Sequence, residues 1–316
     1  MNPTRRLVRS FEAGQRLDVF LAGIAGFSRR RARSIISEGK VWRNGQPTRV
    51  QSRVMEAGDV IELLTSEIEN GDPPWRPQPV TFVHEDPWLV VVNKPTGVLT
   101  QKAEGGGRHD MPLDERVLLN LALREGRRPF LRTIHRIDRL TSGLVVFARA
   151  PQALPPLDRA WRSGKVQRLY LAVVAGKTLW QDQEVDAPIG RDVRHNWRFR
   201  VDDSGRSAKT RVHVIQRGAD STVVVCELLT GRTHQVRVHL THLGHPVLGD
   251  RLYGGGRTDI ERPLLHAWAL ALPHPKDGRR LQLEAPPPEA LMTHLVETDL
   301  VSPWEAQNQG VADDNG

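Results

Sequence analysis

Apolar residues along most of this chain gather in short runs instead of long helical stripes. Six such runs predict strands: WLVVVN, GLVVFAR, YLAVVAG, TRVHVIQ, TVVVCELL and LQLEA. Helical patterns are fewer and predict helices over 113–125, roughly 152–163 and 234–243. This balance predicts an α+β fold, with a strand-rich mixed or antiparallel central sheet and peripheral helices.

The N-terminal part of the chain has a different pattern, an amphipathic helix followed by a hairpin. Ser28 suits the N-cap of this helix. Its apolar positions recur at helical spacing and predict a buried face: Ala32, Ile35 and Ile36. Asn44-Gly45 is a strong signal for a tight hairpin turn, and GDVIEL predicts a further strand. Residues 11–64 are therefore predicted to form a small module of their own.

Three other segments complete the predicted organisation. Residues 67–79, EIENGDPPWRPQP, hold four prolines without periodicity, which indicates an extended linker. A larger domain is predicted over 80–298. Residues 303–316 are polar and predict a disordered tail.

Charge and composition narrow the class of protein. The net charge is +8, and residues 1–66 hold 12 Lys and Arg against 6 Asp and Glu, so 12 − 6 = +6 lies in the first fifth of the chain. A basic module of this kind favours a polyanion such as nucleic acid. A single cysteine, Cys226, excludes an internal disulfide and a cysteine-based zinc site. No long apolar run or secretory signal is found, so we expect a cytoplasmic protein without a membrane segment.

The stretch HRIDRLTSG places Asp138 between Arg136 and Arg139, just before an apolar run. Guanidinium groups stay protonated and favour an ionised aspartate. Such a carboxylate can act as a nucleophile or an electrostatic stabiliser. A surface ion-pair cluster explains the same residues, so both readings stay open on this segment alone.

Two further segments carry candidate chemistry. GRTHQVRVHLTHLGHPVLGDRLYG places Arg232 at a strand-to-helix junction, where its side chain can reach a neighbouring loop. Three histidines at three-residue spacing raise a metal-site hypothesis: His239, His242 and His245. They lack an accompanying acidic or cysteine pattern, so packing or RNA-facing roles are favoured and no metal is expected. Tyr170 lies in the apolar run RLYLAVVAG. We expect it to be either a core side chain or a ring that stacks beneath a base.

The larger domain resembles the RluA-type pseudouridine synthases. Five elements carry the resemblance, in the family's order: VVVNKPTGV, HRIDRLTSGLVVFAR, RLYLAVVAG, GRTHQVRVHLTHLGHPVLGDRLYG and LLHAWAL. The N-terminal module is similar to an S4 RNA-binding domain, a pairing found in members that act on large-subunit ribosomal RNA. The chain departs from the family pattern at three places: Thr100-Gln101, Leu140 and Arg168.

The resemblance implies roles for individual residues. Asp138 matches the essential catalytic aspartate, and Arg232 matches the arginine that pairs with it. Tyr170 matches the tyrosine that stacks on the uracil and is a candidate for proton abstraction. Arg136 matches the residue that enters the RNA stack when the target base leaves, and Leu265 matches an apolar wall of the uracil pocket.

The implied activity is isomerisation of uridine to pseudouridine in structured RNA, without metal or cofactor and by a monomer. Large-subunit (23S-type) ribosomal RNA is favoured over tRNA as the target. Phosphate contacts are expected from basic residues of the N-terminal helix and its end: Arg29, Arg30, Arg31, Arg33 and Lys40. A non-catalytic RNA-binding or ribosome-assembly factor with the same fold is the alternative. The attack by Asp138 on ribose, its attack on uracil and abstraction of a ribose proton remain open as routes.

Overall fold

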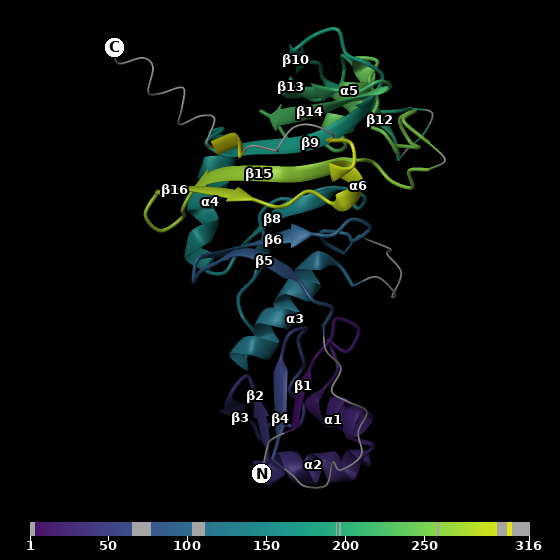
Figure 1. The fold of residues 1–316 in the computed structure, drawn as a ribbon. Coiled ribbons are helices and arrows are strands. Elements are labelled where there is room, and N and C mark those ends of the chain that lie inside the picture. The colour runs from purple at the N-terminus through teal and green to yellow at the C-terminus, as the bar shows by residue number, and fades with distance from the viewer. Residues whose placement is uncertain are drawn as a thin grey trace. The chain divides into compact units, whose positions relative to one another are not determined.

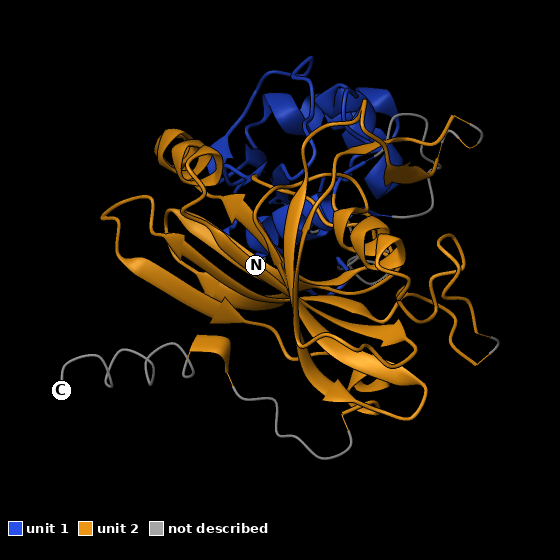
Figure 2. Cartoon of the chain, turned by 90° about the horizontal axis from the view of Figure 1, so that it is seen from above, with its two compact units in different colours: residues 1–80, 101–133 blue, residues 81–100, 134–316 orange. Residues whose placement is uncertain are grey.

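The computed structural model describes residues 4–64, 77–102, 111–193, 195, 197–257, 259–295 and 302–304. The chain divides into two compact units, coloured separately in Figure 2. Unit 1 contains residues 1–80 and 101–133, and unit 2 contains residues 81–100 and 134–316. Most of the predicted linker 67–79 and of the predicted tail 303–316 lies outside the described residues.

Unit 1 contains a small four-stranded sheet with the strand order β1-β4-β2-β3. Its elements are β1 Thr4–Leu7, α1 Leu17–Ala25, α2 Arg29–Ser37, β2 Val41–Arg43, β3 Gln46–Pro47, β4 Val60–Leu63, α3 Leu113–Glu125 and β7 Arg132–Thr133. Helices α1 and α2 bury apolar side chains in a common core with β2 and β4, including Phe20, Ile35, Ile36, Val41 and Ile61. The apolar positions of the N-terminal helix therefore face a core, as predicted.

Local signals in unit 1 form the structures that the sequence predicts. The Ser28 hydroxyl oxygen accepts a hydrogen bond from the backbone N–H of Arg31 at 3.2 Å, which caps α2. Asn44 and Gly45 both have positive φ, at 53° and 75°, and turn the chain between β2 and β3. Two consecutive left-handed residues produce the backbone twist that a two-residue hairpin needs.

Unit 2 is built on a large mixed sheet. Its elements are β5 Thr81–Glu85, β6 Leu89–Lys94, β8 Ser142–Ala148, η1 Pro151–Ala153, α4 Leu154–Arg162, β9 Gln167–Ala175, β10 Asp182–Asp186, β11 Ile189–Arg191, β12 Phe199–Val201, β13 Lys209–Arg217, β14 Ser221–Leu228, α5 Gln235–His242, β15 Leu265–Pro273, β16 Arg280–Glu284 and α6 Glu289–Met292. The main path runs β10-β13-β14-β9-β15-β8-β6-β5, as Figure 1 shows, and β16 pairs with β15. The α+β prediction is confirmed.

Two helices cover parts of this sheet. Helix α4 packs Leu157 and Ala160 into a core with side chains of β6, β8 and β15. Helix α5 packs Val236 and Leu240 against β13, β14 and β9. Among the described residues, no helix is both long enough and apolar enough to cross a membrane.

The glycine of HRIDRLTSG is required by a close approach of two strands. Strands β8 and β15 run parallel, with Gly143 opposite Ala267. A Cβ atom on Gly143 would lie 2.2 Å from the carbonyl oxygen of Ala267, and the residue has a φ of +116°. Any other residue would clash with this backbone and would also be strained. Gly143 therefore fixes the start of β8 directly after the loop that carries Asp138.

Candidate active site

Unit 2 contains a cavity of about 660 Å³, a volume suited to one small molecule or one nucleotide. It is bounded by the loop before β8, by β9, by the turn between β14 and α5, and by the first residue of β15. Every side chain expected to act in catalysis or base flipping lines it: Arg136, Asp138, Tyr170, Arg232 and Leu265. The topology thus brings together positions that are far apart in the sequence.

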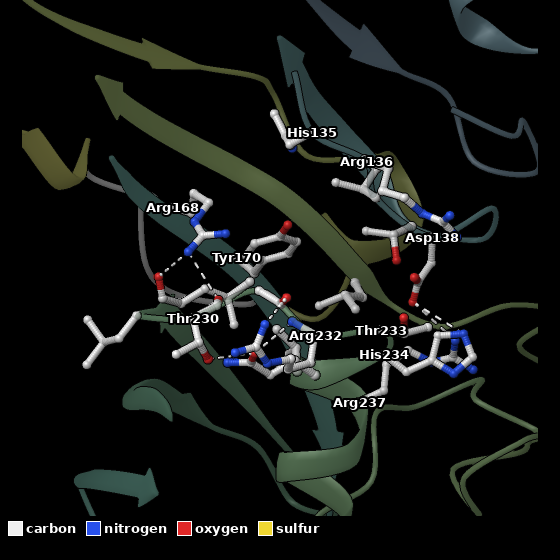
Figure 3. Close-up of a pocket in the computed structure, with 18 of the residues that line it drawn as sticks. His135, Arg136, Asp138, Arg168, Tyr170, Thr230, Arg232, Thr233, His234 and Arg237 are labelled. Carbon is white, nitrogen blue, oxygen red and sulfur yellow. Dashed lines mark hydrogen bonds and ion pairs between the residues drawn. The ribbon is translucent and has the colours of Figure 1, made fainter. Parts of the chain in front are cut away.

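Asp138 lies on the loop that precedes β8, with 22% of its side chain exposed. Its Oδ2 atom accepts a hydrogen bond from Nη1 of Arg237 at 3.3 Å. Nε2 of His234 lies 3.8 Å from the same oxygen. Figure 3 shows these two side chains on one side of the carboxylate. Asp138 is therefore held by helix α5 and its N-cap, and part of it stays open to the cavity.

Arg237 is buried between two carboxylates. Its side chain is 6% exposed, and it donates from Nε to Oδ2 of Asp250 at 2.6 Å and from Nη2 to Oδ1 at 2.9 Å. Burial opposes the charge, but the hydrogen bonds and negative charge of Asp250 outweigh it and raise the pKa of Arg237. The two-point contact fixes the guanidinium plane and aims its remaining nitrogen at Asp138. Arg237 is a permanent cation whose position Asp250 determines.

The prediction that Arg232 pairs with Asp138 is wrong. Arg232 donates from Nε to the backbone oxygen of Ser207 at 2.9 Å, and Arg237 makes the contact with Asp138 instead. The reason is the position of α5. Arg232 lies in the exposed turn before the helix, whereas Arg237 lies within it among buried residues. In Figure 3 Arg232 belongs to a separate group of side chains, near Thr230.

His234 connects this centre to two aromatic residues. It adopts a left-handed backbone with φ of 57°, which is uncommon for a residue other than glycine and is characteristic of functional sites. Its Nδ1 atom lies 2.9 Å from the Tyr253 hydroxyl, whose oxygen accepts the backbone N–H of Phe199 at 3.0 Å. Burial lowers the pKa of His234, which favours the neutral ring. The network favours a proton on Nε2, the atom that faces Asp138.

Tyr170 and Leu265 form an apolar part of the cavity wall. They lie on the neighbouring strands β9 and β15, and both belong to one hydrophobic cluster. Burial raises the pKa of Tyr170 to about 12, so its phenol is neutral at physiological pH. Beside it, Arg168 donates from Nη2 to the backbone oxygens of Leu228 and Thr230, each at 3.1 Å. The wall offers an aromatic ring and one hydroxyl group.

The loop that carries Asp138 is fastened to residues 94–100. Lys94 is fully buried, and its ammonium group donates to the Arg139 oxygen at 3.1 Å and to the Val98 oxygen at 2.8 Å. Thr100 donates from Oγ1 to the Ile137 oxygen at 2.9 Å, and the same atom accepts the Ile137 N–H at 3.3 Å. These bonds hold the residues on both sides of Asp138. Thr100, one of the departures from the family pattern, thus contributes directly to the loop.

Comparison with known proteins places the chain in a family. Residues 88–242 match the family described as RNA pseudouridylate synthase, and residues 15–61 match the S4 domain family. The chain is 34% identical over 290 residues to the uncharacterized RNA pseudouridine synthase YlyB of Bacillus subtilis, covering 90% of this chain and 94% of that protein. It is 36% identical over 294 residues to the ribosomal large subunit pseudouridine synthase D of Nitrosomonas europaea, covering 90% and 84%.

The chain belongs to the RNA pseudouridine synthase family. Among solved structures, human RNA pseudouridylate synthase domain containing 1 matches this synthase with a TM-score of 0.60 and 25% identity, over 77% of this chain and 98% of that one. The family and the enzyme class predicted from the sequence motifs are therefore confirmed. The N-terminal module is confirmed as an S4 domain.

The basic residues of the S4 domain surround a buried carboxylate. Asp18 is fully buried and accepts from Nε of Arg16 at 3.0 Å, of Arg29 at 3.2 Å and of Arg33 at 2.8 Å. Burial opposes ionisation of Asp18, but these hydrogen bonds lower its pKa well below the usual range. Arg29 and Arg33 keep about half of their side chains exposed. They can therefore meet a phosphate while Asp18 fixes their direction.

The other residues of the synthase that are expected to contact RNA lie on helix α2 and just after its end: Arg30, Arg31 and Lys40. Lys40 lies 2.6 Å from a Glu38 oxygen, and Nη1 of Arg31 lies 3.8 Å from that carboxylate. Arg30 is exposed. The S4 domain thus presents the predicted cations, but several of them already have acidic partners.

The three histidines with regular spacing do not converge. The two ring nitrogens of His239 lie 2.8 Å from Thr210 Oγ1 and 3.0 Å from the Ala187 oxygen, and His245 contacts the Ala175 oxygen at 2.9 Å. His242 is exposed. In the part of the chain that the structure describes, no three or more His, Cys, Asp or Glu side chains form a group able to hold a metal ion.

The sequence reasoning missed Arg237, Asp250 and Tyr253. A signal for Arg237 was present: it is the one arginine within the helix segment QVRVHL, where apolar neighbours alternate with it. A charged residue in a helix buried on most sides needs a partner of opposite charge. Asp250 supplies it, 13 residues later in the sequence.

Proposed function

We propose that this synthase isomerises one or more uridines of large-subunit ribosomal RNA, with Asp138 as its essential carboxylate. The observation that carries the proposal is the partly exposed Asp138 in the cavity, held by the buried pair of Arg237 and Asp250. The choice of RNA rests on the S4 domain and on the relative of Nitrosomonas europaea, whose name specifies the large ribosomal subunit.

A flipped uridine would occupy the cavity. The uracil ring would lie against Tyr170 and Leu265, and the ribose would face Asp138. Taking a base out of its stack costs a few kcal/mol, about the energy of one stacking step. Arg136 lines the cavity and carries a planar cation able to stack in the vacated space. We assign Arg136 to this role and Arg232 to the RNA backbone.

The reaction is an isomerisation and needs no imported group. The bond from N1 of uracil to C1′ of ribose breaks, the ring turns, and C5 bonds to C1′. C5 loses a proton and N1 gains one, so atoms and charge balance. Arg237 donates a hydrogen bond to Asp138 and places a positive charge beside it, and the neutral Tyr170 provides the ring surface and one hydroxyl. The proposal is compatible with three routes: attack by Asp138 on ribose, its attack on uracil, and abstraction of a ribose proton.

The S4 domain would contribute phosphate contacts through Arg29, Arg30 and Arg33, which fix register and orientation without selecting a sequence. We propose that a monomer is active, because a single chain supplies every residue assigned to the reaction. A ribosomal substrate would place the synthase in the cytoplasm. tRNA is the second substrate class to test.

The test uses ribosomal RNA from cells that lack the gene. Pseudouridines are mapped by carbodiimide modification and primer extension, before and after addition of purified enzyme. We expect at least one large-subunit uridine to lose and then regain its modification. Unchanged large-subunit RNA, with a changed position in tRNA, would overturn the ribosomal assignment. No change in either RNA would overturn the proposed activity.

A further inference from the structure

The hairpin formed by β11 and β12 carries large apolar side chains in contact with solvent. Trp197 is 65% exposed and Val193 is 80% exposed, although both side chains would ordinarily be at least half buried. The Trp197 ring packs edge-on against that of its described neighbour His195, with 5.4 Å between centroids. Among the described residues these side chains belong to no hydrophobic core cluster. The tip of the hairpin, which carries Val193 and Trp197, therefore exposes an aromatic surface that is not part of a hydrophobic core.

The same hairpin is strongly basic. The segment RDVRHNWRFR, residues 191–200, contains four arginines and one acidic residue, so its formal charge is 4 − 1 = +3. The Arg198 guanidinium lies 5.3 Å from the centre of the Tyr253 ring, and Arg191 lies 6.0 Å from that of Phe199. The hairpin thus combines an exposed indole with several guanidinium groups, which matches the chemistry of a nucleotide, with a base to stack on the indole and a phosphate to pair with a guanidinium group.

The hairpin is anchored on the side chains that hold Asp138. Phe199, at the start of β12, packs its ring edge-on against His234, with 5.7 Å between centroids. Its backbone N–H donates to the Tyr253 hydroxyl at 3.0 Å, and that hydroxyl lies 2.9 Å from His234 Nδ1. His234 in turn faces Asp138. A nucleotide bound at the tip would therefore have a fixed position relative to the catalytic carboxylate.

We propose that the β11–β12 hairpin is a second RNA-binding surface, on which Trp197 stacks with an unpaired base next to the target uridine. Arg191, Arg198 and Arg200 neutralise the phosphates of that single-stranded segment. The inference rests on the proposed function and specifies it: the substrate must have an unpaired nucleotide beside the uridine that is isomerised.

The test compares Trp197→Ala with Trp197→Phe in the full-length enzyme. Leu179→Ala is the matched control, since Leu179 is 98% exposed and does not line the cavity. Binding is measured with an unmodified 23S ribosomal RNA transcript and with a fully paired RNA duplex. Single-turnover rates on the transcript at saturating and at low enzyme concentration separate chemistry from binding.

We expect Trp197→Ala to weaken binding to the transcript about 10-fold or more and to leave duplex binding unchanged. Trp197→Phe should restore most of the affinity, because a phenyl ring also stacks, and Leu179→Ala should have no effect. The saturating rate should stay near that of the wild type. Urea unfolding should be unaffected, since the indole is mainly exposed.

Three results would overturn the inference. They are wild-type affinity in Trp197→Ala, equal losses on transcript and duplex, and no rescue by phenylalanine. The first of these would leave a protein partner as the occupant of the tip. In each case an active wild-type enzyme shows that the proposed function stands, whereas a wild type that isomerises no uridine would remove the proposed function itself.

Discussion

Arg237 donates two hydrogen bonds to Asp250 and one to Asp138. A guanidinium group can hold both carboxylates at once because its nitrogens lie in a fixed plane. Asp250 is 1% exposed, so removing the cation would leave a buried charge unpaired. At the level of single residues, the position of the Asp138 carboxylate therefore depends on a residue that the family resemblance did not single out.

This arrangement predicts different effects for two arginines. Arg237→Lys should reduce the isomerisation rate at saturation by on the order of 100-fold, because one ammonium group cannot keep the three-point geometry. Arg232→Lys should change the saturating rate little, since Arg232 contacts backbone oxygens outside the carboxylate centre. Single-turnover kinetics with both variants measure this, with urea unfolding as the control for folding. A larger rate loss in Arg232→Lys than in Arg237→Lys would instead support the predicted pairing of Arg232 with Asp138.

The sequence predicted most of the residues that line the cavity but not the partner of Asp138. Arg136, Asp138, Tyr170 and Leu265 line the cavity as expected, because each belongs to a short motif whose strand or loop context is local. The partner of Asp138 was misplaced by five positions, from Arg237 to Arg232. The helix itself was predicted within one residue, as 234–243 against Gln235–His242. The error lies in which arginine reaches Asp138, and this depends on the tertiary packing of α5, which a sequence does not display.

At the level of elements, the loop before β8 depends on the neighbouring residues 94–100. The hydroxyl of Thr100 bonds to both the N–H and the oxygen of Ile137, and Lys94 bonds to the oxygen of Arg139. The two residues thus fix the backbone on either side of Asp138. A displacement of about 1 Å at a catalytic group costs on the order of 100-fold in rate.

Thr100→Val should therefore slow isomerisation about 10-fold or more while binding to RNA is retained. Valine keeps the shape of the side chain and removes the hydroxyl, which leaves the buried N–H and oxygen of Ile137 without this partner. Thr100→Ser is the matched control and should keep most of the rate. Equal rates in Thr100→Val and the wild type, measured under saturating enzyme, would show that the loop holds its shape without Thr100.

Gly143 gives a second prediction at this scale. Gly143→Ala should destabilise the protein by more than about 3 kcal/mol or prevent folding, because its Cβ would lie 2.2 Å from the Ala267 oxygen. Gly164→Ala is the control: its φ is +70° but nothing lies within 4 Å, so only about 1–2 kcal/mol of backbone strain applies. Urea unfolding compares the two. Similar losses in both variants would show that β8 and β15 can move apart.

Most elements were predicted, including the apolar, valine-rich strands β6 and β8, but two apolar segments were not. Helix α3 matches the predicted 113–125, and α2 and its hairpin formed as expected. Strand β15, LHAWALALP, and helix α1, LDVFLAGIA, were not predicted. Both are almost continuously apolar, so periodicity cannot distinguish a buried strand from a buried helix.

At the level of the whole molecule, the two compact units do not follow the order of the sequence. Residues 101–133 belong to unit 1 although they interrupt the residues of unit 2. Within unit 1, the Ser10 N–H donates to Glu115 at 2.9 Å, and Arg128 donates from Nε to the Ala57 oxygen at 2.7 Å. Helix α3 also places Leu118 where a Cβ on Gly58 would be in contact. The proline-rich segment 67–79 suggests a domain boundary in the sequence, but it does not indicate that residues 101–133 contact the N-terminal module.

Removing residues 1–64 should therefore loosen α3. In a fragment of residues 65–316, the backbone amides of Leu113–Glu125 should exchange with solvent faster than in the full-length protein, since Leu118 and Glu115 lose their partners. Hydrogen exchange read by mass spectrometry measures this, and β14 in unit 2 is the internal control. Unchanged protection of α3 would show that its stability does not depend on the S4 domain.

The central claim is that Asp138 carries the chemistry while other residues carry RNA binding. Asp138→Asn keeps the size of the side chain and a hydrogen-bonding oxygen for Arg237, but it removes the negative charge. Pseudouridine formation in unmodified large-subunit ribosomal RNA should fall below detection, and the affinity for that RNA should equal that of the wild type. Substantial pseudouridine formation by Asp138→Asn would contradict the account and would favour the alternative interpretation of HRIDRLTSG as a surface ion-pair cluster.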